Sequence, residues 1–391
     1  MFKIFYTEAD TTLYEGAPSL NTGLDEVLEI GKRYGTDGTT LYESRPLLKF
    51  NMPEITSALS KYSVALSNCK FVLQLYTTDA KSLPADYTIT ANVVAQPWIN
   101  GTGYFSSTDS VSNGATWTDN VSGSMWISSS QNILYKSSSY LISGSEGGGG
   151  SWLYSTSGSY FNLVNFNQSF FNVQTIIGPT SFSNMPYREA TDINLDITDV
   201  IDLWISGSSN GDVIDNNGLI LRFSDADVVN GDVHGYIRYF SRDTHTIYVP
   251  RLIMYWDNST FTTGSLTGVN TDSYIVYTDI KPQYKDTEVA KIRIYARDKY
   301  PRKSPTNLSP YQTVKYLPTS SYYTVLDAAT DEVIIPYDGI YNKISCDATS
   351  NFIHIDMSGF MPERYYRLEF KLIDGITEQY ITDSVHFKVI R

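Results

Sequence analysis

Residues 44–52 (SRPLLKFNM) restrict the fold of this chain more than any other short stretch of its sequence. In this stretch an arginine, Arg45, precedes a run of mostly apolar residues. Before it in the sequence come an extended segment at the N-terminus, a loop rich in Gly, Asn and Pro at residues 14–23, and the short apolar segment 27–30. Short strands separated by such turns are typical of antiparallel sheets. We therefore expect a β-sandwich at the N-terminus, and a role in binding or structure rather than in catalysis.

The aromatic content extends this expectation to the whole chain. Tyr, Phe and Trp number 31, 17 and 6, and the segments between them are filled with Ser, Thr, Asn and Gly. Aromatic and β-branched residues favour the pleated surface of a sheet, whereas small polar residues favour turns. We predict an all-β protein, and the length of 391 residues indicates at least two domains.

The spacing of the strand-like runs divides the chain into three parts. Residues 1–257 are predicted to form a jelly-roll-like β-sandwich, with one short helix after residues 195–197 and a long inserted loop region. Residues 258–273 are rich in Ser, Thr, Gly and Asn and are predicted to be a linker. Residues 274–391 carry about eight short strands, which fits an immunoglobulin-like β-sandwich although its Cys…Trp…Cys signature is absent.

The inserted region is the first candidate for a functional surface. Between Lys81 and Arg188 the only basic residue is Lys136, and Ser, Gly and Asn dominate. Loops of this length are uncommon unless they carry function or subunit contacts. The aromatic side chains of the region could anchor neighbouring subunits, stack on sugar rings or simply pack the loop. The candidate interface or glycan-stacking residues are Trp117, Trp126, Trp152 and Tyr154.

The charge distribution separates the two predicted domains. The net charge is −13, with 14 Lys and Arg against 27 Asp and Glu in residues 1–275, and 15 against 15 in residues 276–391. The N-terminal excess would repel phosphate, so we expect no binding of nucleic acid. A candidate docking cluster for an acidic partner, with a solvated strand face as the alternative, consists of Lys291, Arg293, Arg297, Lys299, Arg302 and Lys303.

Motifs for chemistry are weak. Residues 207–211 (GSSNG) match G-x-S-x-G, but they follow a predicted helix rather than a strand, so a helix-terminating turn is the better interpretation. The four histidines have no metal-ligand spacing. We expect no catalytic residues, no cofactor and no metal, and therefore no enzyme. The sequence also shows no signal peptide and no membrane-spanning segment, which predicts folding in a cytoplasm without membrane contact.

Two sets of segments resemble known families. Residues 1–257 resemble the disaggregatase-related (DNRLRE) family of carbohydrate-binding-like β-sandwich modules, in segments 9–11, 18–21, 44–51, 196–205, 217–224, 240–243 and 250–252. The expanded region 98–185 departs from that family's pattern. Residues 310–391 are similar to the C-terminal part of virion structural proteins of large tailed bacteriophages, above all in segments 317–323, 332–337 and 361–366.

Together these resemblances imply a structural protein of a tailed-phage particle, assembled in the host cytoplasm at the neck, the collar or the tail. Such a protein would form a homo-oligomer and contact other virion proteins, such as portal-proximal or tail components. The alternative implied by the first family is a carbohydrate-binding module or an adhesin that recognises host-surface glycans. Hydrolysis of a polysaccharide is a third hypothesis, which no motif supports.

Overall fold

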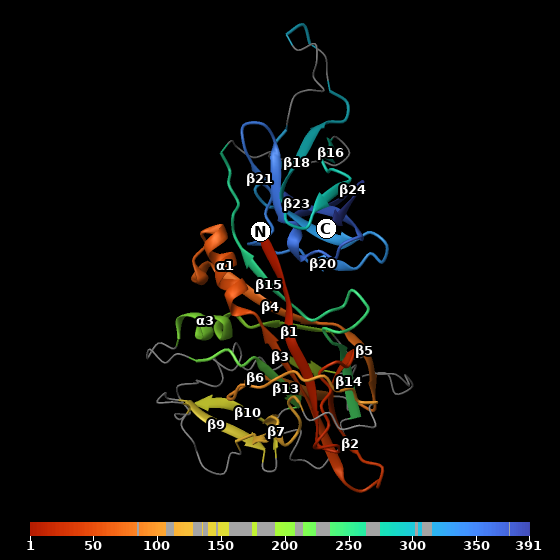
Figure 1. Ribbon diagram of the computed structural model, residues 1–391. Coiled ribbons are helices and arrows are strands. Elements are labelled where there is room, and N and C mark those ends of the chain that lie inside the picture. The colour runs from red at the N-terminus through yellow and green to blue at the C-terminus, as the bar shows by residue number, and fades with distance from the viewer. Residues whose placement is uncertain are drawn as a thin grey trace. The chain divides into compact units, whose positions relative to one another are not determined.

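Strands make up most of the protein, and the prediction of an all-β fold is confirmed (Figure 1). The computed structural model describes residues 1–83, 86–106, 113–127, 135, 140–145, 148–155, 174–177, 192–207, 214–223, 235–262, 274–301, 304–306, 315–374 and 376–391.

The chain divides into two compact units. Phe5–Ile253 form the N-terminal unit, whereas Met254–Arg391 together with Met1–Ile4 form the C-terminal unit. Strands β1 (Phe2–Tyr14) and β15 (Arg251–Trp256) each contribute residues to both units. The division predicted at residue 257 stays a prediction, and most of the predicted linker, residues 263–273, lies outside the described residues.

A sheet of eleven strands forms the frame of the N-terminal unit. Eight strands follow one another in the order β11-β6-β13-β3-β1-β15-β4-β12; β2 pairs with β3 and with β14, and β14 also pairs with β5. The further strands are β2 (Val27–Tyr34), β3 (Leu41–Phe50), β4 (Cys69–Leu75), β5 (Thr77–Lys81), β6 (Asp86–Val93), β11 (Gln174–Ile177), β12 (Ile193–Asp196), β13 (Leu219–Phe223) and β14 (Gly235–Phe240). Two small sheets join β7 (Asp119–Val121) with β8 (Ser124–Met125), and β9 (Tyr140–Ser145) with β10 (Gly148–Ser155).

Strand β3 confirms that the opening apolar run is a strand, and it also shows where the strand ends. Leu47 is fully buried and pairs with Thr11 of β1 and with Ile220 of β13. At Asn51 the backbone turns into a helix, α1 (Met52–Tyr62), which the sequence analysis did not predict. The side chain of Asn51 accepts a hydrogen bond from the Glu54 N–H at 3.1 Å, as a helix N-cap does.

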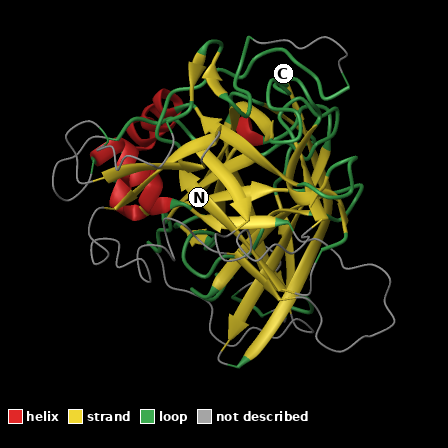
Figure 2. Cartoon of the chain, turned by 90° about the horizontal axis from the view of Figure 1, so that it is seen from below, coloured by secondary structure: helices red, strands yellow, loops and turns green. Residues whose placement is uncertain are grey.

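The predicted helix after residue 197 is confirmed as α3 (Thr198–Ser206). Four apolar side chains of this helix are buried, and the helix ends at Gly207, where φ is +78°. Glycine adopts such a conformation at little cost, so it commonly ends helices. Figure 2 shows the helices of the N-terminal unit gathered on the same flank of the strands. This unit therefore has two α-helices in its described residues, where the sequence analysis expected one.

Two sheets form the C-terminal unit. Their strand orders are β16-β18-β22-β21 and β17-β24-β23-β19-β20. Burial alternates along β18, where Ala290, Ile292 and Ile294 are buried between more exposed neighbours, as expected for a strand with one face on a core. The strands are β16 (Tyr274–Thr278), β17 (Gln283–Lys285), β18 (Val289–Asp298), β19 (Ser321–Asp327), β20 (Val333–Ile335), β21 (Ser345–Cys346), β22 (Asn351–Asp356), β23 (Tyr365–Asp374) and β24 (Thr377–Ile390).

Candidate functional site

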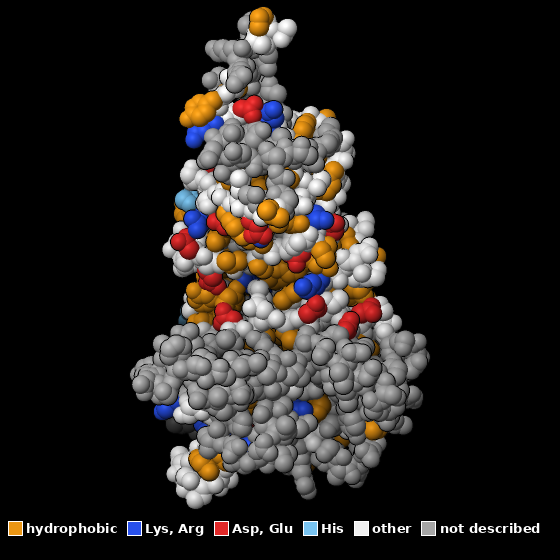
Figure 3. Space-filling model, turned by 180° about the vertical axis from the view of Figure 1, so that it is seen from behind, with side chains coloured by type: hydrophobic (Ala, Val, Ile, Leu, Met, Phe, Trp, Pro, Cys, Tyr) orange, Lys and Arg blue, Asp and Glu red, His pale blue; other side chains and the backbone are white. Residues whose placement is uncertain are grey.

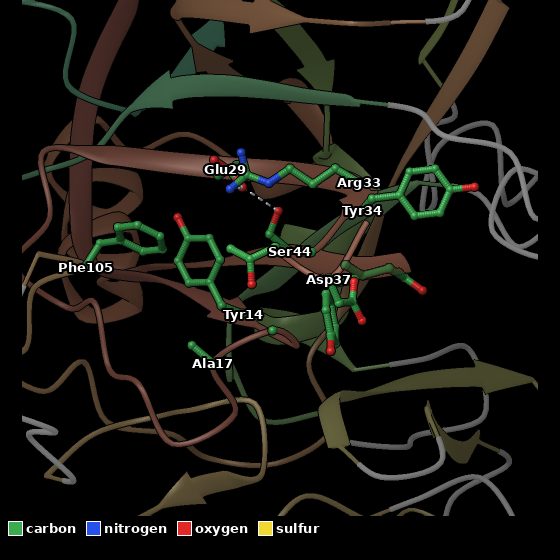
Figure 4. A pocket seen from close by; sticks show the side chains of 13 residues that line it. Tyr14, Ala17, Glu29, Arg33, Tyr34, Asp37, Ser44 and Phe105 are labelled. Atoms are coloured by element: carbon green, nitrogen blue, oxygen red, sulfur yellow. Dashed lines mark hydrogen bonds and ion pairs between the residues drawn. The ribbon is translucent and has the colours of Figure 1, made fainter. Parts of the chain in front are cut away.

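A cleft with a volume of about 480 Å³ lies in the N-terminal unit. It is lined by residues of β1, β2 and β3, by the loops that connect these strands, and by Phe105. Ligand pockets typically have volumes of roughly 300–1,000 Å³. Figure 4 shows Phe105 and Tyr14 on one side of the cleft and Tyr34 on the other, with Glu29 and Arg33 between them. The cleft is therefore large enough for a small ligand.

The pairing of β2 with β3 brings the polar lining together. Gly31 lies opposite Ser44, and Arg33 lies opposite Tyr42. Side chains alternate between the two faces of a strand, so Glu29 and Arg33 share a face. Directly opposed residues also share a face, which places Ser44 and Tyr42 beside them.

Glu29 is the electrostatic centre of the cleft. Its carboxylate is almost fully buried, and it forms ion pairs with Arg33 and Arg238, both at 2.9 Å. It also accepts a hydrogen bond from the Ser44 hydroxyl at 3.0 Å. A buried carboxylate needs such partners, because losing water without them is costly. Glu29 consequently holds the half-exposed guanidinium of Arg33 in place beside the cleft.

The turn between β2 and β3 carries a second carboxylate at the rim. Asp37 accepts hydrogen bonds from the N–H groups of Thr39 and Thr40, at 3.0 and 3.1 Å. The Thr40 hydroxyl and these two N–H groups lower the pKa of Asp37 to about 2, because each of them favours the ionised carboxylate. Asp37 is therefore ionised throughout the neutral range.

One wall of the cleft is aromatic and firmly supported. The rings of Tyr14 and Phe105 lie 4.9 Å apart at an angle of 56°. The backbone N–H of Phe105 donates to both carboxylate oxygens of Asp25, at 3.0 and 3.1 Å. Burial raises the pKa of the Tyr14 hydroxyl well above its usual range, and the nearby carboxylates of Glu29 and Asp25 add to the shift. Tyr14 therefore stays a neutral hydroxyl under ordinary conditions.

Two glycines make room for the ring of Tyr42. A Cβ atom added to Gly16 would lie 3.3 Å from the Cγ atom of Tyr42, and one added to Gly35 would lie 2.4 Å from its Cε2 atom. Side chains at these positions would displace the ring. Gly16 and Gly35 thus allow the Tyr42 ring to lie against the backbone of both loops.

The tryptophans predicted as surface anchors are buried. Trp117, Trp126 and Trp152 are only 4%, 6% and 7% exposed, and they pack in one apolar cluster with Leu13 and Leu47. This corrects the expectation that their rings face a partner or a sugar, and it supports the alternative that they pack the inserted region. Tyr154 lies in β10, but its side chain is outside the described part of the structure.

Two buried arginines complete this cluster. The guanidinium carbon of Arg45 lies 5.0 Å from the ring centroid of Trp117 and 5.6 Å from that of Trp152, and the guanidinium carbon of Arg222 lies 4.3 Å from the Trp152 centroid. Arg45 also pairs with Glu43 at 2.9 Å and donates to the Gly149 carbonyl at 2.9 Å. Cation–π contacts and hydrogen bonds compensate these cations for their loss of water.

The predicted basic cluster is partly neutralised within the chain. Lys291 and Arg293 project from β18 and bind the carboxylate of Asp347, at 2.9 and 3.0 Å. Arg293 and then Lys291 hold the pKa of Asp347 well below its usual range. The other predicted members are Arg297, near the end of β18, Lys299, just beyond it, and Arg302 and Lys303, which lie outside the described residues.

The five-stranded sheet carries a surface that we call the tyrosine face. Tyr365 lies opposite Lys388, and both Tyr380 and Tyr322 lie opposite Lys371. Tyr365 and Tyr380 are 55% and 56% exposed. The ring of Tyr337 packs edge-on against that of Tyr380, with 5.9 Å between the ring centroids. The tyrosine face consists of Tyr322, Tyr337, Tyr365 and Tyr380.

Most charged residues around the tyrosine face form ion pairs with one another, while Glu369 accepts hydrogen bonds from the hydroxyls of Tyr337 and Thr382, at 2.9 and 3.1 Å. Lys371 binds Glu378 at 2.9 Å, and Arg367 binds Asp331 at 3.0 Å. Lys388 forms a further ion pair with Glu363. Figure 3 shows hydrophobic side chains at the surface of the chain among charged side chains of both signs. The tyrosine face thus combines exposed aromatic area with compensated charge.

The described residues hold neither a metal-binding cluster nor a membrane-spanning helix. Within them, no group of three or more His, Cys, Asp or Glu side chains is arranged to hold a metal ion. In the same part of the chain, no helix combines the length and the apolar character needed to cross a membrane. The expectation that the protein uses no cofactor stays a prediction.

Comparisons with known proteins identify no family. No family model matches the chain, and no curated protein matches it. Among solved structures, the adhesin domain of Epf from Streptococcus pyogenes is similar with a TM-score of 0.16 and 7% sequence identity, over 99% of this chain and 98% of that chain. A likeness this weak carries no argument about fold or function.

Sequence reasoning missed most of the residues that line the cleft. Tyr34 and Leu41 flank a six-residue turn, so recognising residues 27–50 as one hairpin would have placed Tyr42, the residue after Leu41, beside Arg33. Phe105 belongs to the inserted region, but only the tertiary structure brings it next to Tyr14. No local pattern connects two residues that far apart in the sequence.

Proposed function

We propose that this protein is a non-enzymatic structural component of a tailed-phage particle, placed at the neck, the collar or the tail. The similarity of residues 310–391 to virion structural proteins supports this proposal. The observation that carries it is the tyrosine face, with Tyr365 and Tyr380 more than half exposed among charges that are already paired. Tyrosine is enriched in the cores of protein interfaces, whereas charged residues such as Lys and Glu belong mostly to the rim.

The proposed partner of the tyrosine face is another protein of the particle. Tyrosine supplies a large contact area and a polar hydroxyl. Its ring therefore packs well against a protein surface, and its hydroxyl is hydrated while the surface is exposed before assembly. The local ion pairs leave little net charge to be desolvated when the partner docks. In a symmetric particle each such contact is repeated, and moderate affinity at one copy becomes firm attachment of the assembly.

The test is to introduce Tyr365→Ser and Tyr380→Ser together into the phage that encodes this chain. Copies of the protein per purified particle are then counted by quantitative mass spectrometry. We expect at least about a tenfold loss, because two interface tyrosines are removed. Tyr300→Ser is the matched control, since Tyr300 is 80% exposed and lies outside the tyrosine face.

Two results would contradict the proposal. One is the absence of the wild-type chain from purified particles, and the other is the retention of the double variant at the wild-type copy number. Because both tyrosines are more than half exposed, their replacement leaves the buried core of the unit unchanged. If the double variant is lost from the particles while the control Tyr300→Ser is retained, the loss therefore reports docking rather than folding.

A second candidate function is recognition of a host-surface glycan, as a carbohydrate-binding module or an adhesin would perform it. The cleft favours it, because exposed aromatic rings there flank a floor of carboxylate and guanidinium groups. Sites that fix a small ligand usually combine apolar walls with a few convergent polar groups. Binding of the full chain to an array of bacterial glycans would support this function, and no binding to any glycan would reject it.

A further inference from the structure

We infer that the cleft in the N-terminal unit is a binding site for a neutral saccharide, with Phe105 contacting a sugar ring and Arg33 contacting hydroxyl groups. This inference rests on the second function proposed above. It moves the sugar-contacting aromatic residue from the inserted tryptophans, which are buried, to Phe105 at the rim of the cleft.

The aromatic wall of the cleft is available for contact. Phe105 is 51% exposed and lies beside Tyr14, whereas the ring of Tyr34 points away from both (Figure 4). The C–H faces of a sugar ring are apolar and pack on flat aromatic rings. Because Tyr14 supports the ring of Phe105 and Asp25 holds its backbone, this wall is ordered before a ligand arrives. Such preorganisation reduces the entropy lost on binding.

The floor of the cleft offers both donors and acceptors. The Arg33 guanidinium supplies N–H donors, while the carboxylate of Asp37 supplies acceptors. A sugar hydroxyl donates and accepts at once, so it suits a floor in which both kinds of group lie close together. Hydrogen bonds to charged groups are stronger than neutral ones, and they would fix the orientation of the saccharide.

The charge balance of the cleft selects a neutral ligand. The carboxylate of Glu29 is paired with Arg33 and Arg238, and that of Glu43 is paired with Arg45. Arg238 also pairs with Asp79 at 3.7 Å, and Asp37 at the rim accepts from the N–H groups of Thr39 and Thr40, so the carboxylates slightly outnumber the cations near the cleft. An anionic sugar would meet the carboxylates of Glu29 and Asp37, and a cationic ligand would meet Arg33 in the middle of the floor. A saccharide without ionised groups avoids both repulsions.

The inference is tested with the full chain on an array of neutral, amino and acidic glycans. The neutral oligosaccharide that binds best is then titrated calorimetrically against wild type and Phe105→Ala. We expect the variant to bind about tenfold more weakly, because it loses the stacking contact. Tyr104→Ala is the matched control: Tyr104 is 47% exposed and adjacent to Phe105, but it does not line the cleft, so its affinity should be unchanged. Affinity should also be the same in low and high salt.

Each other outcome would overturn the inference. Binding only of acidic or amino glycans, with affinity that falls in high salt, would refute neutrality while glycan recognition stands. Equal affinity of wild type and Phe105→Ala would place any glycan site elsewhere. Binding of choline or spermidine but of no glycan would make the cleft a cation site, and binding of nothing would reject both the inference and the second function. The copy number of the protein in particles, which tests the first proposed function, is measured independently of these binding experiments.

Discussion

At the residue scale, glycine conformation explains how the inserted region packs on the core. Gly148, Gly149 and Gly150 all have positive φ values, and the N–H of Gly149 donates to the Trp117 carbonyl at 2.6 Å. A Cβ atom at Gly149 would lie 2.7 Å from the Trp117 ring and 2.9 Å from the Arg45 guanidinium. In the sequence, this glycine run has the composition of a flexible loop. In the structure its backbone packs directly against Trp117 and leaves no room for a side chain at Gly149.

Gly149→Ala should therefore lower the free energy of unfolding of the N-terminal unit by about 2–4 kcal/mol, from the left-handed backbone and the overpacking together. Gly123→Ala is the matched control, since Gly123 has a φ of +77° with open space around it. The control should cost only about 1–2 kcal/mol. Denaturant unfolding followed by tryptophan fluorescence measures both, and equal costs would show that the contact with Trp117 is unimportant.

Asp10 gives the N-terminal unit a dependence on pH. Burial raises the pKa of its carboxyl from 3.8 to about 7; the hydrogen bond from the Arg242 N–H, at 2.7 Å, opposes the shift, and the charge of Asp243 adds to it. The folded chain therefore keeps a proton that the unfolded chain has already lost. The resulting stabilisation is complete below the unfolded pKa, and it is lost as the pH rises through the folded pKa.

Asp10→Asn should remove this dependence, because the amide resembles the protonated acid. Between about pH 5 and pH 8 the wild type should lose about 2–3 kcal/mol of unfolding free energy relative to the variant. Chemical denaturation of both proteins across this range measures the difference. If the two stability curves stay parallel over the range, Asp10 is ionised in the folded chain and the interpretation is wrong.

At the scale of elements, the side chain of one polar residue, Asn51, caps the N-terminus of helix α1. The N–H of Glu54 donates to the Asn51 side chain at 3.1 Å. Asn51→Ala should lower the unfolding free energy by about 1 kcal/mol. Asn51→Asp should keep most of the wild-type stability, because aspartate also caps helices. Denaturation midpoints of the two variants provide the measurement, and equal losses would mean that the cap contributes nothing.

The sequence predicted elements where local pattern and burial agree. Strand β3 buries five residues in a row, from Ser44 to Leu48, and α3 has four buried apolar residues within nine positions, so both were predicted. Helix α1 buries only Ile55 and Ala58, which leaves too weak an apolar stripe to recognise. The cleft could not be predicted because Phe105 is far in the sequence from the residues of β1, β2 and β3 that line it, and only the tertiary structure brings them together. The burial of Trp117 and Trp152 likewise depends on partners distant in the sequence, Arg45 and Arg222.

At the scale of the whole molecule, the C-terminal unit is not continuous in sequence. Its core includes Phe2, which is fully buried and packs edge-on against Phe360 with 5.9 Å between the ring centroids. Ile4 also belongs to this unit, and a Cβ atom at Gly359 would lie 2.4 Å from the Cβ atom of Ile4. The first four residues are thus a structural part of a unit whose other residues begin at Met254.

Phe2→Ala should accordingly destabilise the C-terminal unit by about 3–5 kcal/mol, the usual cost of emptying a buried aromatic site. Hydrogen exchange measured by mass spectrometry should show faster exchange in β22 and β23, while β3 and β13 of the N-terminal unit keep their protection. Phe261→Ala is the matched control, because Phe261 belongs to the same unit and is 40% exposed. Faster exchange in β3 and β13 with β22 and β23 unchanged would assign the N-terminal residues to the other unit. The same dependence implies that a fragment starting at Met254 will be less stable than this unit is in the full chain, since it lacks the strand residues that fill its core.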